Sequence, residues 1–346
     1  MASFPVIPLP NVGDVNETVT RFELIESLGA PTWYTVIHLI LAAMGAVANA
    51  LVIYILLRKP KMRTYPNIFV FSLALSDLVF CALAIPLSWA VNLVNGYHGW
   101  LAHVSSVSYD TCTLVGALCL TTMSIERYEA VSDPIGHVQR SSVKRGWLTI
   151  AGFWVGSILV SILFYVFVIL PAGQEDVRSA NLRNLNLASK LYSFIVMFAV
   201  PLLIAVIFYM LLFKALKQRR DIPGRARSTA RSHGRITRMV TAVVVAYVVS
   251  WSPAHILGLV TVSGSPYNII ALALALRVCF VLQVINAVTN PFLYALLGER
   301  FGFYIREMMC GKNLSKPQHR NGVHTVTQGH GLRQGGTSSM VDSQAQ

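Results

Sequence analysis

The stretch Met239–Leu276, MVTAVVVAYVVSWSPAHILGLVTVSGSPYNIIALALAL, contains no lysine, arginine, aspartate or glutamate. A helix of about 20 mostly apolar residues crosses the ~30 Å hydrocarbon layer of a bilayer, so this stretch is too long for a single crossing. The turn-forming residues Ser263–Asn268 interrupt it. We therefore predict two membrane-spanning helices here, joined by a short turn.

Further apolar runs of spanning length come before this stretch. Backbone groups in lipid must pair within their own segment, so such runs are interpreted as helices. The seven predicted spans are residues 32–57, 67–94, 104–128, 147–170, 191–216, 236–261 and 270–297. We predict an all-α membrane protein in which residues 32–297 form one seven-transmembrane helix bundle.

The composition supports a chain that lies mostly in lipid. Only 12% of the 346 residues are charged and 54% are hydrophobic, whereas soluble domains usually carry about 25% charged residues. The formal net charge is +13, but the basic residues form short clusters between apolar runs. This pattern indicates a membrane surface and argues against nucleic-acid binding.

Lysine and arginine lie mainly in the connections after the first, third and fifth spans and in the carboxyl-terminal segment. The opposite side carries only Arg21, Arg178, Arg183, Lys190 and Arg277. Basic connections remain in the cytoplasm, so we predict a multi-pass protein of the cell membrane with residues 1–31 outside the cell. No cleavable signal peptide is apparent, and the first span would direct insertion.

Three features concern modification and the carboxyl-terminal segment. Asn16 begins an Asn-Glu-Thr tripeptide, which is an acceptor sequence for glycosylation. Residues 298–310 alternate apolar and charged side chains at helical spacing and predict an amphipathic helix on the inner leaflet. Cys310 at its end is a candidate for palmitoylation or an ordinary reduced thiol. The composition of residues 311–346 predicts a disordered cytoplasmic tail.

The five cysteines show neither a disulfide framework nor metal-knuckle spacing, so we expect no structural disulfide and no resident metal. One ionisable residue, Asp77, interrupts the apolar run Phe69–Leu87. Such a residue is costly in lipid and is by default a functional candidate. We expect Asn49, Asn286 and Asn290 as its partners, in an allosteric sodium or proton-sensitive site or in a purely structural polar network.

Other features suggest a bundle that changes shape. Pro201, Pro253 and Pro291 lie within spans and predict kinks. Glu126-Arg127-Tyr128 ends the third span at the inner face, where Arg127 could also act as a simple interface anchor.

Together these motifs resemble those of the rhodopsin-like, or class A, G-protein-coupled receptors over roughly residues 33–310. In chain order they are Gly45 with Asn49, Leu73–Asp77, Glu126–Tyr128, Trp154, Pro201 with Tyr209, Ser250–Pro253 and Asn290–Tyr294. The somatostatin, opioid and galanin receptors are the most similar subgroup, on the segments Arg235–Val240 and Asn290–Gly298.

The resemblance implies that an extracellular ligand acts near Trp251 and that the inner end of helix six then swings outward to admit a heterotrimeric G protein. It also implies arrestin, receptor kinases and membrane lipid as partners. No acidic residue low on helix six pairs with Arg127, because His233 occupies that place, and Thr237 could bind Arg127 instead. The residues implied in activation are Glu126, Arg127, Tyr128, Tyr209, Thr237, Asn290, Pro291 and Tyr294.

The chain departs from the family in several positions. Ala102 stands near the place of a cysteine that usually bridges to the second outer loop, and residues 171–189 contain no cysteine. Tyr109 replaces the aspartate of amine receptors. Asp110 beside it is turned by about 100° around the helix, so we expect it at the rim, with an amine-binding role as the alternative. Gly116 replaces a serine of the sodium site, and the last span has no lysine for retinal.

By position, six residues should face the outer cavity, although bundle packing would equally explain each of them. They are Tyr109, Thr113, Trp251, His255, Phe280 and Gln283.

We therefore predict a receptor that transduces an extracellular ligand, a neuropeptide, into G-protein activation. The alternatives are a receptor of the same fold for an amine or other small molecule, and a non-signalling scavenger receptor. An enzyme is not expected because Asp77 lacks a paired carboxylate within the bundle, and a transporter is not expected because internal repeats are not visible.

Overall fold

The computed structural model describes residues 32–93, 100–169, 179–220, 227–262 and 269–310. Within these ranges the chain is helical except for short connections. Asn16, the turn Ser263–Asn268 and the tail 311–346 lie outside the described residues.

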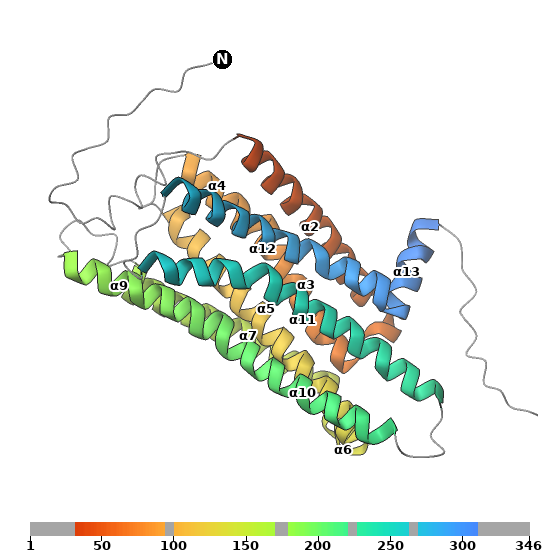
Figure 1. Cartoon of the computed structure of the whole chain (residues 1–346). Coiled ribbons are helices and arrows are strands. Elements are labelled where there is room, and N and C mark those ends of the chain that lie inside the picture. The colour runs from red at the N-terminus through yellow and green to blue at the C-terminus, as the bar shows by residue number, and fades with distance from the viewer. Residues whose placement is uncertain (1–31, 94–99, 170–178, 221–226, 263–268, 311–346) are drawn as a thin grey trace, which may run out of the picture.

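Long helices lie side by side in a bundle (Figure 1). In chain order they are α2 (Thr32–Arg58), α3 (Tyr65–Val79) with α4 (Ile85–Leu93), α5 (Trp100–Ser132), α7 (Val143–Phe164), α9 (Ser179–Tyr192) with α10 (Val200–Arg220), α11 (Arg227–Val262) and α12 (Ile269–Leu297). The other described elements are a 3-10 turn (Pro60–Met62), the short helices α6 (Pro134–Arg140) and α13 (Glu299–Cys310), and π-helical turns that are described below. Helices α6 and α13 lie at the same end of the bundle, which we call the α13 end (Figure 1).

Six of the described helical segments are long and apolar enough to span a membrane. Helix α5 is also long, but it is not among these six. Its buried polar side chains include Thr111, Thr113, Thr121 and Ser124. Helix α5 contacts α3, α4, α7, α10 and α11, so it is surrounded by protein rather than lipid and tolerates these groups. With α5, the predicted seven-helix bundle is confirmed.

Apolar side chains also cover the outside of the bundle. Val47, Leu148 and Phe167 have 72%, 73% and 70% of their surface exposed, and comparable residues occur on most of the long helices. Such a surface suits contact with lipid acyl chains.

Two helices begin earlier than the sequence predicts. Helix α9, which precedes α10 in the fifth span, begins at Ser179, whereas the span is predicted to begin at residue 191. Helix α11, the sixth span, begins at Arg227, whereas the span is predicted to begin at residue 236. Hydropathy marks only the part of a helix with apolar side chains, whereas the backbone hydrogen bonds continue through the polar residues before it.

Three π-helical turns were not predicted from the sequence. They are Phe80–Ala84 between α3 and α4, Tyr165–Ile169 after α7, and Ser193–Ala199 between α9 and α10. Each ends two residues before a proline, namely Pro86, Pro171 and Pro201. Proline has no N–H and its ring crowds the carbonyl four residues earlier, so a wider turn before it relieves the clash.

Candidate functional site

A cavity of about 360 Å³ opens at the end of the bundle opposite α13. It lies among α4, α5, α9, α11 and α12, and its volume is in the range of small-ligand sites. All six residues expected to face an outer cavity line it: Tyr109, Thr113, Trp251, His255, Phe280 and Gln283.

Hydrogen bonds and ring contacts order this cavity. The Tyr109 hydroxyl of α5 donates to Oε1 of Gln283 on α12 at 2.7 Å. The rings of His255 and Trp251 stack on α11 with centroids 6.2 Å apart, and Phe198 stacks on His255 at 4.8 Å. Ser193 Oγ lies 3.3 Å from Nδ1 of His255. These contacts fix the side chains that a ligand would meet.

Two charged residues also line the cavity, Asp110 of α5 and Lys190 of α9. Asp110 therefore shares the cavity with Tyr109, although the two side chains are turned by about 100° around the helix. The cavity reaches from Ser88 on α4 to Ser189 on α9, so it covers a wide arc of α5 and contacts the adjacent residues Tyr109 and Asp110. Sequence reasoning did not select Lys190, although a lone lysine before a long apolar run was a usable signal.

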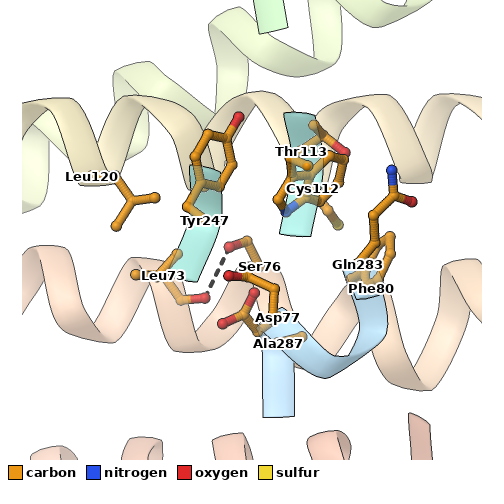
Figure 2. A pocket seen from close by; sticks show the side chains of 13 residues that line it. Leu73, Ser76, Asp77, Phe80, Cys112, Thr113, Leu120, Tyr247, Gln283 and Ala287 are labelled. Atoms are coloured by element: carbon orange, nitrogen blue, oxygen red, sulfur yellow. Dashed lines mark hydrogen bonds between the residues drawn. The ribbon is translucent and has the colours of Figure 1, made fainter. Parts of the chain in front are cut away.

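A second, smaller cavity of about 20 Å³ surrounds Asp77 deeper in the bundle. This volume is enough for one water-sized species. Figure 2 shows Ser76 and Asp77 projecting from α3 into the space between α5 and α12. Three residues, Thr113, Trp251 and Gln283, line both the large and the small cavity.

Of the three predicted partners of Asp77, Asn290 and Asn286 lie at the small cavity, whereas Asn49 binds elsewhere. Nδ2 of Asn290 donates to Oδ2 of Asp77 at 2.8 Å, and Asn286 lines the small cavity with its buried Oδ1 lacking a hydrogen-bond partner. Asn49 does not bind Asp77. Its Nδ2 donates instead to the carbonyl oxygens of Gly45 at 2.9 Å and Ala287 at 3.0 Å. The backbone competes successfully for this amide because Pro291 leaves the Ala287 carbonyl without its usual helical donor.

At the α13 end, the Glu126-Arg127-Tyr128 triplet lies near the end of α5. The Glu126 carboxylate faces His137 of α6, with 3.6 Å between Oε2 and Nε2. The buried Nε atom of Arg127 has no hydrogen-bond partner among the described side chains. The Tyr128 ring packs edge-to-face on Phe208 of α10 at 5.6 Å.

The remaining residues implied in activation are also buried. The hydroxyls of Tyr209 and Tyr294 are buried without a hydrogen bond, and the Tyr294 ring lies 5.8 Å from that of Phe301 on α13. Thr237 is buried, but no hydrogen bond joins it to Arg127 among the described side chains. The side chains of His233 and Cys310 are outside the described set.

Sequence reasoning missed His137 and the helix α6 that carries it. Asp133 caps this helix, because its Oδ1 accepts from the Gly136 N–H at 3.0 Å, and Pro134 occupies the first helical position. An aspartate followed by proline is a sequence signal for a helix start. The hydrogen bond from Gly136, together with Arg140, holds the pKa of the Asp133 carboxyl below its ordinary value.

Comparison with known proteins agrees with this arrangement. Residues 48–294 match the family described as 7 transmembrane receptor (rhodopsin family). The bovine protein named somatostatin receptor type 5 (Bos taurus) is 29% identical over 280 residues, which are 80% of this chain and 75% of that protein. The mouse somatostatin receptor type 2 (Mus musculus) is 28% identical over 284 residues, 80% of this chain and 76% of that protein.

A third similar protein comes from an insect. The neuropeptide F receptor of Drosophila melanogaster is 26% identical over 343 residues, which cover 87% of this chain and 69% of that protein. The family match spans well over half of the sequence and includes α5 with its Glu126-Arg127-Tyr128 triplet. The chain therefore belongs to the rhodopsin family of seven-transmembrane receptors.

Proposed function

We propose that this chain is a G-protein-coupled receptor that binds an extracellular peptide in the large cavity and activates a heterotrimeric G protein at the α13 end. The observation that carries the proposal is the shared lining of the two cavities. A ligand in the large cavity meets Trp251, Thr113 and Gln283, and the same side chains border the small cavity at Asp77. Ligand contact can thus bias the packing of the bundle through differential affinity for its two states.

The orientation follows from charge. Arg58 ends α2, Lys59 follows it and Arg140 ends α6, all at the α13 end. Lys214 and Lys217 lie in the last turns of α10 at that end. This end faces the cytoplasm by the positive-inside rule, which places residues 1–31 outside the cell.

The large cavity suits a ligand that carries both a positive and a negative group. Asp110 can accept a basic group and Lys190 can bind a carboxylate, and the described residues form no salt bridge between these two side chains. The relatives named above are somatostatin and neuropeptide F receptors, which supports a peptide. An amine ligand is less well supported, because Tyr109 occupies the position at which amine receptors carry aspartate.

We also propose that the small cavity binds a sodium ion. The Asp77 carboxylate supplies the charge, and the buried Oδ1 atoms of Asn286 and Asn290 are acceptors without partners. Gly116 contributes no hydroxyl, so water would complete the coordination. A bound ion would neutralise Asp77 and stabilise the packing around Trp251.

The experiment is a nucleotide-exchange assay on membranes that contain the full-length receptor and purified G-protein heterotrimers, screened with neuropeptides and with biogenic amines. We expect a peptide to stimulate exchange. Arg127→Ala should abolish stimulation while retaining peptide binding, and Asp110→Asn should weaken binding of peptides with a basic group by at least ~10-fold.

Three outcomes would contradict this proposal. A response to amines alone would identify a small-molecule receptor. Peptide binding and uptake without nucleotide exchange in the wild-type protein would identify a scavenger. Equal stimulation in the wild type and in Arg127→Ala would remove Arg127 from the coupling mechanism.

A further inference from the structure

Three potential metal ligands meet where α5 joins α6. One of them, Glu126, also belongs to the triplet implied in activation, whereas Glu129 and His137 have no part in the function proposed above. Glu126 and Glu129 are three residues apart on α5 and therefore share a face of that helix. His137 projects from α6 onto the same face. We propose that Glu126, Glu129 and His137 form a binding site for Zn²⁺ that links the end of α5 to α6.

The separations match those of a coordination sphere. The two imidazole nitrogens of His137 face different carboxylates: Nε2 lies 3.6 Å from Oε2 of Glu126, and Nδ1 lies 3.7 Å from Oε2 of Glu129. With one ligand atom from each residue, all three atoms lie within 4.8 Å of one another. Ligands about 2.0 Å from a tetrahedral zinc ion are roughly 3.3 Å apart, so zinc binding through one nitrogen of His137 requires the three side chains to rotate toward one another.

Burial of Glu126 supports a cation at this point independently of the distances. Its side chain is only 7% exposed, and its Oε2 atom, which faces His137, has no hydrogen-bond partner. A buried carboxylate oxygen without a partner is energetically unfavourable. A metal ion bound to this oxygen would remove that cost.

The nearby arginine does not occupy the site. Nη2 of Arg140 lies 3.2 Å from Oδ2 of Asp133 but 4.0 Å from Oε2 of Glu129, so Asp133 is the main partner of this arginine. Asp133 also caps α6, and a Cβ atom on Gly136 would collide with its carboxylate. Asp133 and Gly136 thereby hold α6 in the position that directs His137 toward the two glutamates.

The donor set favours zinc over the abundant hard cations. One imidazole nitrogen and two carboxylate oxygens, with water as a fourth ligand, form a tetrahedral zinc site. Ca²⁺ and Mg²⁺ require six or more oxygen ligands and bind imidazole poorly. The proposal departs from the expectation of no metal, because residues 126, 129 and 137 lack a recognisable ligand spacing and meet only through the turn at Asp133.

The experiment is calorimetric titration of Zn²⁺ into the purified full-length receptor in detergent, with millimolar Mg²⁺ present throughout, together with thermal unfolding of the same samples. We expect one binding event that raises Tm. His137→Ala should weaken this event at least ~10-fold, and His137→Cys, which keeps a zinc ligand, should retain it. His103→Ala, which removes a histidine at the opposite end of the bundle, should bind zinc as the wild type does.

A second variant guards against misfolding. Glu129→Gln removes a partly exposed carboxylate and should weaken zinc binding while leaving the zinc-free Tm unchanged. Identical isotherms for the wild type, His137→Ala and Glu129→Gln would overturn the proposal, since the zinc would then bind elsewhere. An equal Tm rise with Ca²⁺ or Mg²⁺ in place of zinc would overturn the assignment of the metal.

Discussion

Nδ2 of Asn49 on α2 donates a hydrogen bond of 3.0 Å to the carbonyl oxygen of Ala287 on α12. Pro291, four residues after Ala287, has no N–H, so this carbonyl would otherwise be a buried acceptor without its helical donor. A comparable contact occurs at Pro201. The Tyr247 hydroxyl donates at 2.9 Å to the carbonyl of Met197, which is four residues before that proline. Side chains from other helices thus satisfy the acceptors that two prolines leave free.

The first prediction concerns Asn49. Asn49→Ala should lower the free energy of unfolding by about 1–3 kcal/mol, because the Ala287 carbonyl becomes a buried acceptor without a donor. In a Pro291→Ala background the restored N–H can bind this carbonyl, and the same substitution should cost less. Thermal unfolding of the four proteins in detergent measures the coupling. Additive effects of the two substitutions would show that the Asn49 bond does not compensate for the proline.

The second prediction concerns Tyr247. Tyr247→Phe removes only the hydroxyl that binds the Met197 carbonyl and should cost about 0.6–1.7 kcal/mol, as hydrogen bonds between helices in a membrane do. Tyr54→Phe is a matched control, because Tyr54 is 47% exposed on the outside of the bundle and should tolerate the change. Equal Tm values for Tyr247→Phe and the wild type would contradict the assigned role of this hydroxyl.

The third prediction concerns the close approach of α2 to its neighbours at Gly45. A Cβ atom there would lie 2.7 Å from Sγ of Cys81 and 3.3 Å from Cγ2 of Val288. Gly45→Ala should therefore destabilise the protein by about 1–3 kcal/mol. Gly152→Ala on α7 is the control, since nothing lies within 4 Å of the added atom, and it should be stabilising by about 0.5–1 kcal/mol. A stabilising effect at both positions would mean that α2 packs less closely than described.

The fourth prediction tests the proposed sodium site at Asp77. Replacing choline chloride with sodium chloride at constant ionic strength should raise the Tm of the wild type, and each kcal/mol of binding free energy corresponds to roughly 2–4 °C. Asp77→Asn should abolish this shift, because the amide can still accept from Asn290 but carries no charge. Asp110→Asn, which removes a carboxylate from the other cavity, should leave it intact. A persistent sodium shift in Asp77→Asn would exclude Asp77 as the site.

Several features of this protein follow from the sequence alone. Hydropathy predicts the number and approximate ranges of the helices, since transfer of a segment into lipid depends on its own composition. Local spacing within one helix also places Tyr109, Thr113, Trp251 and His255 on faces that line a common cavity. The capping signal at Asp133 and Pro134, which starts α6, is equally local.

Other features depend on how the helices are rotated and how deep each one lies in the bundle. Whether Asn49 binds Asp77 or the Ala287 carbonyl is decided by distances between helices that no local pattern specifies. The inclusion of Asp110 and Lys190 in the cavity, and the meeting of His137 with Glu126, have the same origin. The sequence determined a membrane bundle and its motifs because lipid transfer and helix periodicity are local properties. Only the tertiary structure decided which polar groups become partners, because that depends on the packing of residues distant in the chain.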